Sequence, residues 1–468
     1  YIASGAQAEA AGDLQVSYHA GLVSAREEKA LGVNVNFDPC VDILYNWRNT
    51  IVNTRAYGTD AETVIKYTNA YLDGLTAENG ENMEDGVIQC IKHFPGDGTE
   101  ERDQHLVLGV NELSPEEWRA SFGKVYQNHI DRGVEMIMAG HIAVPALQKE
   151  LNSALEDKDI MPATLAEELI QDALKTELGF NGLVITDATH MLGMTSAMRR
   201  EDYVPKSIAA GCDMFLFFNN IEEDFGFMLK GYQNGVITEE RLTDALRRIL
   251  GLKAKLHLPE KQANGTLLRT REDLNVIGCE EHLQWRAEAA DKGISLIKDT
   301  QNNLPINPVD HQRIRLYMLE GEKGGITDNG SKAQQLFVDE LTKRGYEVTV
   351  NERGSRVKGA TLKYRDEVDF ALEVADIAGY GAQNNYRIQW STAMANEVPW
   401  FVWEVPHAFV SLNFTTHLHD ATMVKTFVNA YHNNEETIKQ VIDKLEGKSE
   451  FKGGHNDLVW TDKWQAKL

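Results

Sequence analysis

Cysteine is scarce in this sequence, with only four among 468 residues. The four are far apart and form no CxxC pair, and three of them lie in or beside apolar runs that are typical of strands. This pattern favours buried, small hydrophobic side chains over a zinc site or a disulfide framework. It is also typical of a reducing compartment, so a cytoplasmic location is favoured.

Positive charge and long hydrophobic runs are lacking as well. No apolar run approaches the ~18 residues that a membrane-spanning helix needs. Lys and Arg together number 47 against 71 Asp and Glu, which gives a net charge of −24. Such a surface repels phosphate backbones, and no basic cluster with interleaved aromatic residues is present, so nucleic acid is not expected as a partner. The chain begins Tyr-Ile-Ala, which gives no information on targeting.

The first part of the sequence repeats one theme: a short apolar run ends in polar residues, and a Gly-, Pro- or Asp-rich loop and a helical stretch follow. The apolar runs are 33–38, 87–93, 134–141, 183–187 and 212–217. The helical stretches include 115–132 and 162–177, the second opened by Pro162 and closed by Gly179. Strands that alternate with helices predict a parallel sheet, in a (β/α) barrel or a doubly wound fold.

The ends of the predicted strands distinguish these two folds. Asp, Lys and His side chains lie at the C-terminal ends of the runs, at positions 38, 92, 93, 141 and 187. In a (β/α)8 barrel these ends face one mouth, where catalytic residues from several strands meet. A Rossmann-type sheet requires an early GxGxxG, and none is present. We therefore predict a TIM-like barrel, although the five or six strand candidates before residue 260 are too few for eight strands.

The rest of the sequence predicts a second α/β domain. Its strand candidates include 293–298, 314–319, 401–403 and 408–412, and its helix candidates include 332–344 and 435–445. The predicted organisation is a TIM-barrel-like catalytic domain at 1–258, a linker and connecting helix at 259–292, and an αβα sandwich domain at 293–468.

Asp187 ends the apolar run of "GLVITDATHM" abruptly. Taken alone, an Asp after a strand is more often the N-cap of the next helix. The other ionisable strand ends make it a candidate for chemistry. A carboxylate at a barrel mouth can be a nucleophile, an acceptor for sugar hydroxyls or a metal ligand.

The stretch "IKHFPGDGTEERDQHL" at 91–106 is the densest in ionisable groups. Lys92 and His93 are adjacent, so both reach one ligand only if the strand ends or twists there. Asp103 and His105 lie two residues apart on a loop expected to be mobile. A carboxylate bound to one ring nitrogen fixes the tautomer and orients the other nitrogen, as a general acid/base requires. Such a pair also occurs by chance in solvated loops.

Arg55 and His141 complete the candidates. Arg55 can grip a hydroxyl or carboxylate through a forked pair of hydrogen bonds, or form a surface salt bridge. His141 is included as a substrate-binding candidate, although a core-edge histidine satisfied by the backbone is the favoured interpretation. A metal site built from the histidines and Asp187 is weaker, because their spacing matches no standard ligand pattern. No metal or other cofactor is expected.

Together these motifs resemble glycoside hydrolase family 3, in its β-N-acetylhexosaminidase branch. The branch pattern KHFPGxG followed by DxH is matched by "KHFPGDG" and "DQH". Further matches, in the family's order, are "NVNFDPCVDI", "IMAGH", "PATL", "ELGFNGLVITDA", "AAGCDMFLF" and "GVITEERLTDALRRIL". Agreement over so many motifs in order is specific. The second half, through "AADKGISLIKD", "NLPI" and "LEGKSEFKG", resembles the sandwich domain of longer members.

The resemblance implies a retaining exo-β-N-acetylglucosaminidase that acts on cell-wall muropeptides or chito-oligosaccharides, so that the partner is a carbohydrate. It implies that Asp187 is the nucleophile and that His105, paired with Asp103, is the acid/base. The residues implied to bind sugar hydroxyls are Lys92, His93 and Arg55.

Two features depart from the family. Asp97 stands where members usually carry a second histidine, and we hypothesise that it adds negative charge beside the dyad. Members also usually carry, before "YIASGAQAEAAGD", a stretch with the first barrel strands and a sugar-binding aspartate, which this sequence does not contain.

Three alternatives stay open. Phosphate can replace water in the second step, giving a phosphorylase, because a histidine acid/base does not repel phosphate as a carboxylate does. The sugar can be glucose, as in a β-glucosidase, although the Asp103–His105 pair disfavours this alternative. The chain can also be a non-catalytic, sugar-binding relic of an enzyme. The short N-terminal part favours this interpretation. The presence of Asp187, Asp103 and His105 speaks against it.

Overall fold

The computed structural model describes residues 2–83, 85–321, 332–356, 360–377, 387–460 and 464–468. The chain forms two compact units: Ser17–Leu283 together with Ile2, and Ala3–Val16 together with Gln284–Leu468. The boundaries fall within two helices, α2 (Leu14–Leu31) and α12 (Glu280–Gly293). In the described residues, no helix is both long and apolar enough to cross a bilayer.

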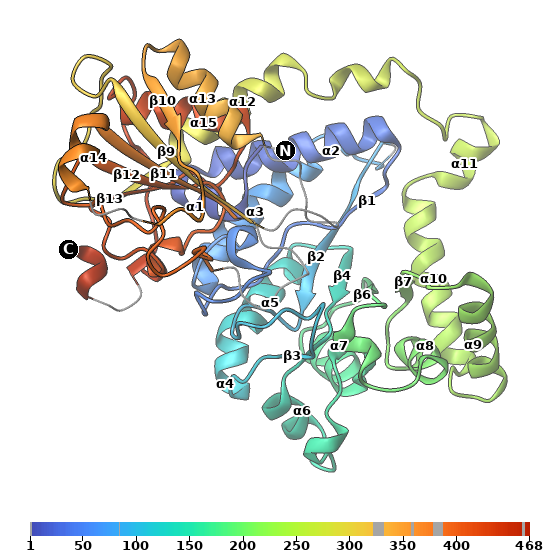
Figure 1. Cartoon of the computed structure of the whole chain (residues 1–468). Coiled ribbons are helices and arrows are strands. Elements are labelled where there is room, and N and C mark those ends of the chain that lie inside the picture. The colour runs from blue at the N-terminus through green and yellow to red at the C-terminus, as the bar shows by residue number, and fades with distance from the viewer. Residues whose placement is uncertain (1, 84, 322–331, 357–359, 378–386, 461–463) are drawn as a thin grey trace. The chain divides into compact units, whose positions relative to one another are not determined.

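The first unit is built on a parallel sheet that curls like part of a barrel (Figure 1). Its five strands, in spatial order, are β1 (Val35–Asn36), β2 (Ile88–Phe94), β4 (Met136–Ala139), β6 (Leu183–Ala188) and β7 (Met214–Leu216). All neighbouring pairs are parallel. Each of the five strands overlaps one of the five predicted apolar runs. The predicted TIM-like α/β class is confirmed.

Helices connect these strands in the first unit. They are α3 (Ala61–Thr76), α4 (Pro115–Trp118), α5 (Lys124–Asp131), α6 (Pro145–Leu151), α7 (Leu192–Thr195), α8 (Arg200–Ala209), α9 (Ile221–Gln233), α10 (Glu239–Lys255) and α11 (Leu258–Ala263). A π-helical segment, η2 (Arg119–Gly123), joins α4 to α5, so the predicted helix over 115–132 is continuous. Two short strands, β3 (Gly109–Val110) and β5 (Ile142–Ala143), pair in parallel.

The helix predicted over 162–177 begins later than expected. Pro162 is extended and precedes a 3-10 turn, η4 (Ala163–Leu165), and the helical segment η5 (Glu168–Glu177) follows as a π-helix. This turn places the hydroxyl of Thr164 within hydrogen-bond distance of the His141 ring. Gly179 follows the helix with a φ of 71°, as its predicted role in ending the helix requires.

Alternate residues of the strands form the core on one face of this sheet. Cys90, Met136 and Leu183 lie in register on neighbouring strands and pack with Leu256 and other apolar residues near the end of α10. Because side chains of a strand alternate between faces, this burial fixes which residues end up at the C-terminal edge of the sheet.

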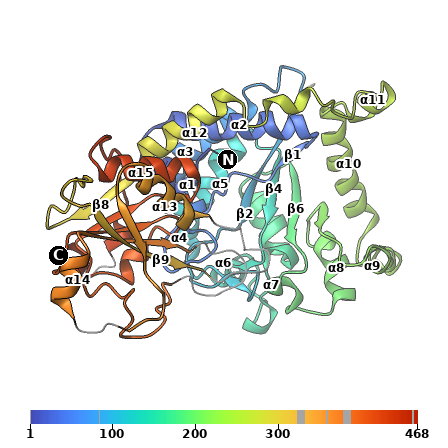
Figure 2. The same cartoon turned by 45° about the horizontal axis from the view of Figure 1, so that its top comes forward.

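The second unit contains a six-stranded sheet (Figure 2). Its spatial order is β10 (Glu347–Val350), β9 (Arg313–Glu320), β11 (Phe370–Asp376), β12 (His407–Ser411), β13 (Thr426–Asn429) and β8 (Ser295–Asp299). Only β8 runs antiparallel to its neighbour. Residues of α12, α13 (Ala333–Lys343) and α15 (Glu435–Leu445) pack on one face, and α14 (Thr361–Glu367) and irregular segments cover the other. Helix α1 (Gly5–Ala11) also belongs to this unit. The predicted sandwich class is confirmed.

One predicted strand of the second unit is wrong. Residues 401–403 form a turn, in which Phe401 stacks on Tyr317 with ring centroids 4.9 Å apart. The apolar run there fills the core from a loop, and it forms no strand. Strands β10, β11 and β13 were not predicted.

Candidate active site

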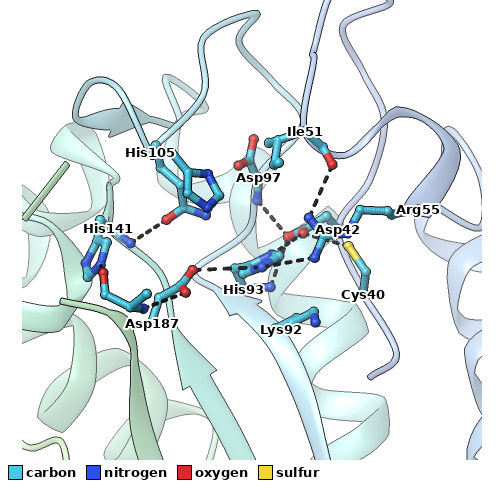
Figure 3. Close-up of polar contacts among 12 residues, drawn as sticks. Cys40, Asp42, Ile51, Arg55, Lys92, His93, Asp97, His105, His141 and Asp187 are labelled. Atoms are coloured by element: carbon cyan, nitrogen blue, oxygen red, sulfur yellow. Dashed lines mark hydrogen bonds and ion pairs between the residues drawn. The ribbon is translucent and has the colours of Figure 1, made fainter. Parts of the chain in front are cut away.

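Polar side chains gather at the C-terminal edge of the first sheet (Figure 3). Asp187 lies at the end of β6, and Lys92 and His93 lie at the end of β2. His141 follows β4. The peptide bond between Lys92 and His93 is cis.

Asp187 is a largely buried carboxylate with a positive surround. One oxygen, Oδ1, accepts the amide of Ala188 at 2.7 Å, and Oδ2 lies 3.9 Å from His93 Nε2. Burial alone favours the neutral acid. The charges of His93 and His141 and the Ala188 hydrogen bond outweigh it, so the pKa of Asp187 lies below its ordinary value. The group is therefore an anion at neutral pH, as a nucleophile must be.

His93 is oriented by a second carboxylate, Asp42, which the sequence analysis missed. His93 Nδ1 donates to Asp42 Oδ2 at 2.7 Å, and the His93 amide donates to Oδ1 at 3.2 Å. Asp42 is completely buried, which opposes ionisation, but the charge and hydrogen bonds of His93 lower the pKa of Asp42 to about 2. The signal in the sequence was a single acid in the otherwise apolar run at 40–44.

Two cations flank His93. The Nη2 of Arg55 lies 3.5 Å from His93 Nε2, and its Nη1 donates to the carbonyl of Ile51 at 3.2 Å. The Nζ of Lys92 lies 3.4 Å from Asp38 Oδ1. The three residues predicted to bind sugar hydroxyls are thus grouped beside Asp187, where forked and charged donors can bind hydroxyl oxygens.

Asp103 and His105 form the hydrogen-bonded pair that their spacing predicted. Asp103 Oδ1 accepts from His105 Nδ1 at 2.6 Å and from the His105 amide at 2.8 Å. Asp103 is fully buried, whereas 28% of the His105 side chain is exposed. The carboxylate fixes Nδ1 as the protonated nitrogen and directs Nε2 to the other side of the ring.

The dyad loop, residues 103–107, is tied to the segment that follows Asp187. The carbonyls of His105 and Gln104 accept the amides of Leu192 and Gly193 at 3.0 and 3.1 Å. The buried Gln104 side chain also accepts the amide of His141 at 2.7 Å. The sequence predicted a mobile loop, and the role of Gln104 was not predicted. These hydrogen bonds, made to residues remote in sequence, anchor the loop beside β4 and β6.

His141 lies within the protein and has no exposed surface. It is fully buried, its Nε2 donates to the carbonyl of Ala188 at 2.9 Å, and its Nδ1 meets Thr164 Oγ1 at 3.0 Å. Burial lowers the pKa of His141, although the charge of Asp187 opposes this. The hydrogen bond from His141 to the Ala188 carbonyl therefore supports the backbone on which Asp187 stands.

The surroundings of Asp97 oppose the negative charge that was hypothesised beside the dyad. Its Oδ1 accepts from Asn49 Nδ2 at 2.9 Å and from the Gly98 amide at 2.6 Å. Burial and the charge of Asp42 raise the pKa of Asp97 to about 8. These surroundings favour the protonated form of Asp97, and its backbone amide donates to Asp42 at 2.8 Å.

Glycines on either side of Asp97 allow this close packing. A Cβ at Gly98 would lie 2.0 Å from the carbonyl oxygen of Ile43, and one at Gly96 would lie 2.1 Å from the ring of Phe122. Both glycines also have φ values near 110°, a region that side chains disfavour.

Among the residues that the structure describes, Cys40, Asp42 and His93 form a cluster of three side chains that could hold a metal ion. Their potential ligand atoms all lie within 4.8 Å of one another. Asp42 Oδ2 accepts from both Cys40 Sγ, at 2.9 Å, and His93 Nδ1. A hydrogen-bonded network therefore accounts for the closeness of the three groups.

Comparison with known proteins places this arrangement in a family. Residues 3–252, just over half of the chain, match the model of the glycosyl hydrolase family 3 N-terminal domain. A β-N-acetylglucosaminidase/β-glucosidase of Cellulomonas fimi is 39% identical over the whole chain and 82% of its own length. Beta-hexosaminidase A of Pseudoalteromonas piscicida is 27% identical over 67% of the chain. The chain spans about half the length of that relative and of several other β-hexosaminidases.

Solved structures give the same result. The β-glucoside phosphorylase BglX superposes over the whole chain and 82% of its own length, with a TM-score of 0.93 and 37% identity. A family 3 β-N-acetylglucosaminidase from Paenibacillus shares the fold over 97% of the chain, with a TM-score of 0.79 and 22% identity. By its family match and its identity with the Cellulomonas relative, this chain is a member of glycoside hydrolase family 3.

Proposed function

We propose that this protein is a retaining exo-β-N-acetylglucosaminidase, with Asp187 as nucleophile and His105 as acid/base. The observation that carries the proposal is the ionised, nearly buried Asp187, with a carboxylate-oriented histidine on the loop tied to the segment after it. The sugar class follows the names of the Cellulomonas and Pseudoalteromonas relatives. Its natural substrates are cell-wall muropeptides or chito-oligosaccharides.

The first step makes a glycosyl ester. An oxygen of Asp187 attacks the anomeric carbon, the glycosidic C–O bond breaks, and Nε2 of His105 gives its proton to the leaving oxygen. Asp103 stabilises the proton on Nδ1 throughout. Lys92, Arg55 and His93 hold the hydroxyls of the sugar, and Asp42 keeps Nδ1 of His93 protonated so that Nε2 faces the substrate.

The second step releases the sugar. Water attacks the anomeric carbon while His105 takes its proton, and the ester to Asp187 breaks. Two inversions at the same carbon give net retention. A histidine suits both steps because neither of its protonation states repels the Asp187 carboxylate.

A phosphorylase is a second candidate, favoured by the 37% identity with β-glucoside phosphorylase BglX. Phosphate is already an anion and needs no general base to attack the ester. The neutral state of Asp97 also fits, because no extra carboxylate charge then stands near the dyad to repel it. In this candidate the product is a sugar 1-phosphate.

Hydrolysis of aryl β-N-acetylglucosaminide and aryl β-glucoside, with and without phosphate, tests both candidates. We expect turnover of the N-acetyl substrate, abolished by Asp187→Ala, with N-acetylglucosamine as the product. A phosphate-dependent rate with a sugar 1-phosphate as product selects the phosphorylase. Equal turnover by the Asp187→Ala variant would place the nucleophile elsewhere.

A further inference from the structure

His141 connects the loop of the acid/base dyad to the backbone beside the nucleophile. Its amide donates to Gln104 Oε1 at 2.7 Å, and its carbonyl accepts the amide of Gly109, beyond the dyad, at 3.0 Å. Its ring donates to the carbonyl of Ala188, next to Asp187 (Figure 3). Both groups proposed to act on the glycosidic bond are therefore tied to this one residue.

Gln104 makes the side-chain part of this connection. It lies between Asp103 and His105 in sequence and is 1% exposed, whereas the His105 side chain is 28% exposed. Its bond to His141 spans 37 positions, so it fixes the loop to a remote part of the fold. Loss of this acceptor would leave a buried amide unpaired, which costs more than the loss of an exposed hydrogen bond.

Two glycines allow Gln104 to lie this close to its neighbours. A Cβ at Gly140 would lie 3.3 Å from Gln104 Oε1 and 3.1 Å from His93 Cβ. One at Gly193 would lie 2.8 Å from the carbonyl oxygen of Gln104, which accepts the Gly193 amide at 3.1 Å. Gln104 thus contacts the segments that follow both β4 and β6, one through its side chain and the other through its backbone.

We propose that Gln104 is a positioning residue, which acts through His105 and sets where the Nε2 of that ring lies relative to Asp187. This inference rests on the proposed function. Asp103 fixes the tautomer and orientation of the ring, but it belongs to the same loop, so it does not by itself place that loop in the site. Proton transfer requires the ring nitrogen within hydrogen-bond reach of the leaving oxygen, and a displacement of about 1 Å can cost roughly 10²-fold in rate. Gln104 supplies the placement.

One substitution and a matched control in the full chain test this role. Gln104→Met keeps a long, buried side chain and removes the acceptor. Gln148→Met is the control, because Gln148 is also buried in the first unit and its Oε1 accepts the amide of Val144 at 2.9 Å. The other side-chain hydrogen bonds of Gln148 go to Met161 and Glu168, outside the dyad loop.

The kcat/KM is measured for phenyl and dinitrophenyl glycosides of the sugar that the wild type turns over, since only the phenyl leaving oxygen needs protonation. We expect Gln104→Met to lose about tenfold on the phenyl glycoside and about threefold or less on the dinitrophenyl glycoside. Gln148→Met should change both values by the same factor. In a His105→Ala background, Gln104→Met should add no further loss, because the ring on which it acts is gone. Equal losses on the two substrates, or losses that add fully to those of His105→Ala, would overturn the proposal.

Hydrogen exchange tests the anchoring of the loop without turnover. The amides of His141, Leu192 and Gly193 should exchange faster in Gln104→Met than in the wild type and in Gln148→Met. Unchanged exchange at these amides would overturn the proposal. If His105→Ala itself lost equally on both glycosides, the proposed acid role would fail together with this inference. If His105→Ala showed the leaving-group dependence and Gln104→Met did not, the proposed function would stand and this inference alone would fail.

Discussion

Two fully buried acids, one in each unit, have opposite surroundings. In the first unit, Asp42 accepts four hydrogen bonds, from Cys40 Sγ, the ring and amide of His93, and the amide of Asp97. In the second unit, neither carboxylate oxygen of Glu373 has a partner within the described part of the chain. The two carboxylates are equally buried, but only Asp42 is surrounded by hydrogen-bond donors.

The difference in donors sets the charge of each acid. Burial favours the neutral form of Asp42, but His93 and the other donors hold the pKa of Asp42 at about 2. Burial and the charge of Glu397 raise the pKa of Glu373 well above its ordinary value. Burial without donors makes a neutral acid, whereas burial with donors makes an anion that can orient a histidine. The predictions below test this contrast, ordered by expected effect on turnover.

Asp187→Ala gives the largest loss. It removes the proposed nucleophile while the histidines around it remain, so we expect turnover to fall by about 10⁴-fold or more. Stability is expected to fall modestly, because the folded protein holds Asp187 as an anion and the histidines around it lose a charge partner. Turnover of an aryl glycoside and thermal melting measure the two effects. A variant that melts far below the wild type would attribute the loss to misfolding.

His105→Ala and Asp103→Asn come next. General acid/base catalysis contributes roughly 10²- to 10⁴-fold, and we expect losses in that range for poor leaving groups. Aryl substrates with acidic phenols should lose less, because their leaving oxygen needs little protonation. Arg102→Ala, an exposed neighbour paired with Glu100, is the control. Equal losses for good and poor leaving groups would contradict an acid role for His105.

Asp42→Asn is expected to raise KM about tenfold and to destabilise the fold by about 3 kcal/mol, because a buried partner of His93 loses its charge. The pKa of Asp42 is depressed in the folded state, so its contribution is present above the ordinary value of 3.8 and lost as pH falls toward 2. Denaturant unfolding between pH 2 and pH 6 measures this. Asp73→Asn, which alters an exposed pair with Arg132, is the control. A parallel pH dependence in wild type and Asp42→Asn would exclude Asp42 as the titrating group.

The sequence predicted the parts of the site that depend on local order. Strand ends such as Asp187 follow an apolar run directly, and the Asp103–His105 pair lies two residues apart. Asp42, Gln104 and Asn49 were missed because their partners lie 51, 37 and 48 residues away in sequence. Only the register of neighbouring strands and loops brings these pairs together.

In the second unit, too, elements set by local sequence were predicted and those set by remote contacts were not. The helices α13 and α15 match the predicted helices at 332–344 and 435–445. Strand β11 was missed, and it carries Glu373 in the middle of a buried run. Phe401 was misassigned because a run of apolar residues describes burial and not hydrogen bonding. Its stacking on Tyr317 depends on a contact across the fold.

Asp97→Asn is expected to change turnover less than twofold. The amide keeps an oxygen for Asn49 and Gly98 and matches the neutral state of the acid. The pKa of Asp97 is about 8 when folded, so the wild type loses stability as pH rises from about 4 to 8, whereas the variant does not. The variant should therefore melt higher than wild type at pH 8, and this difference in melting temperature should be smaller at pH 5. A constant difference across this range would show that Asp97 is ionised when folded.

Glu373→Gln should leave turnover unchanged and affect only stability, since Glu373 lies in the second unit's sheet, beside Tyr317 in register. The folded state holds this acid protonated, so the wild type is most stable below the ordinary value of 4.5 and loses stability as pH rises above it. Glutamine cannot ionise, so the gain in melting temperature over wild type should grow from pH 5 to pH 8. This trend is opposite to that of Asp42, whose contribution to stability is lost as pH falls. Glu367→Gln, an exposed change on α14, should show no such trend. A smaller gain in melting temperature at pH 8 than at pH 5 would contradict this prediction. Glu373 would then be held as an anion by a donor, and the contrast between the two buried acids would fail.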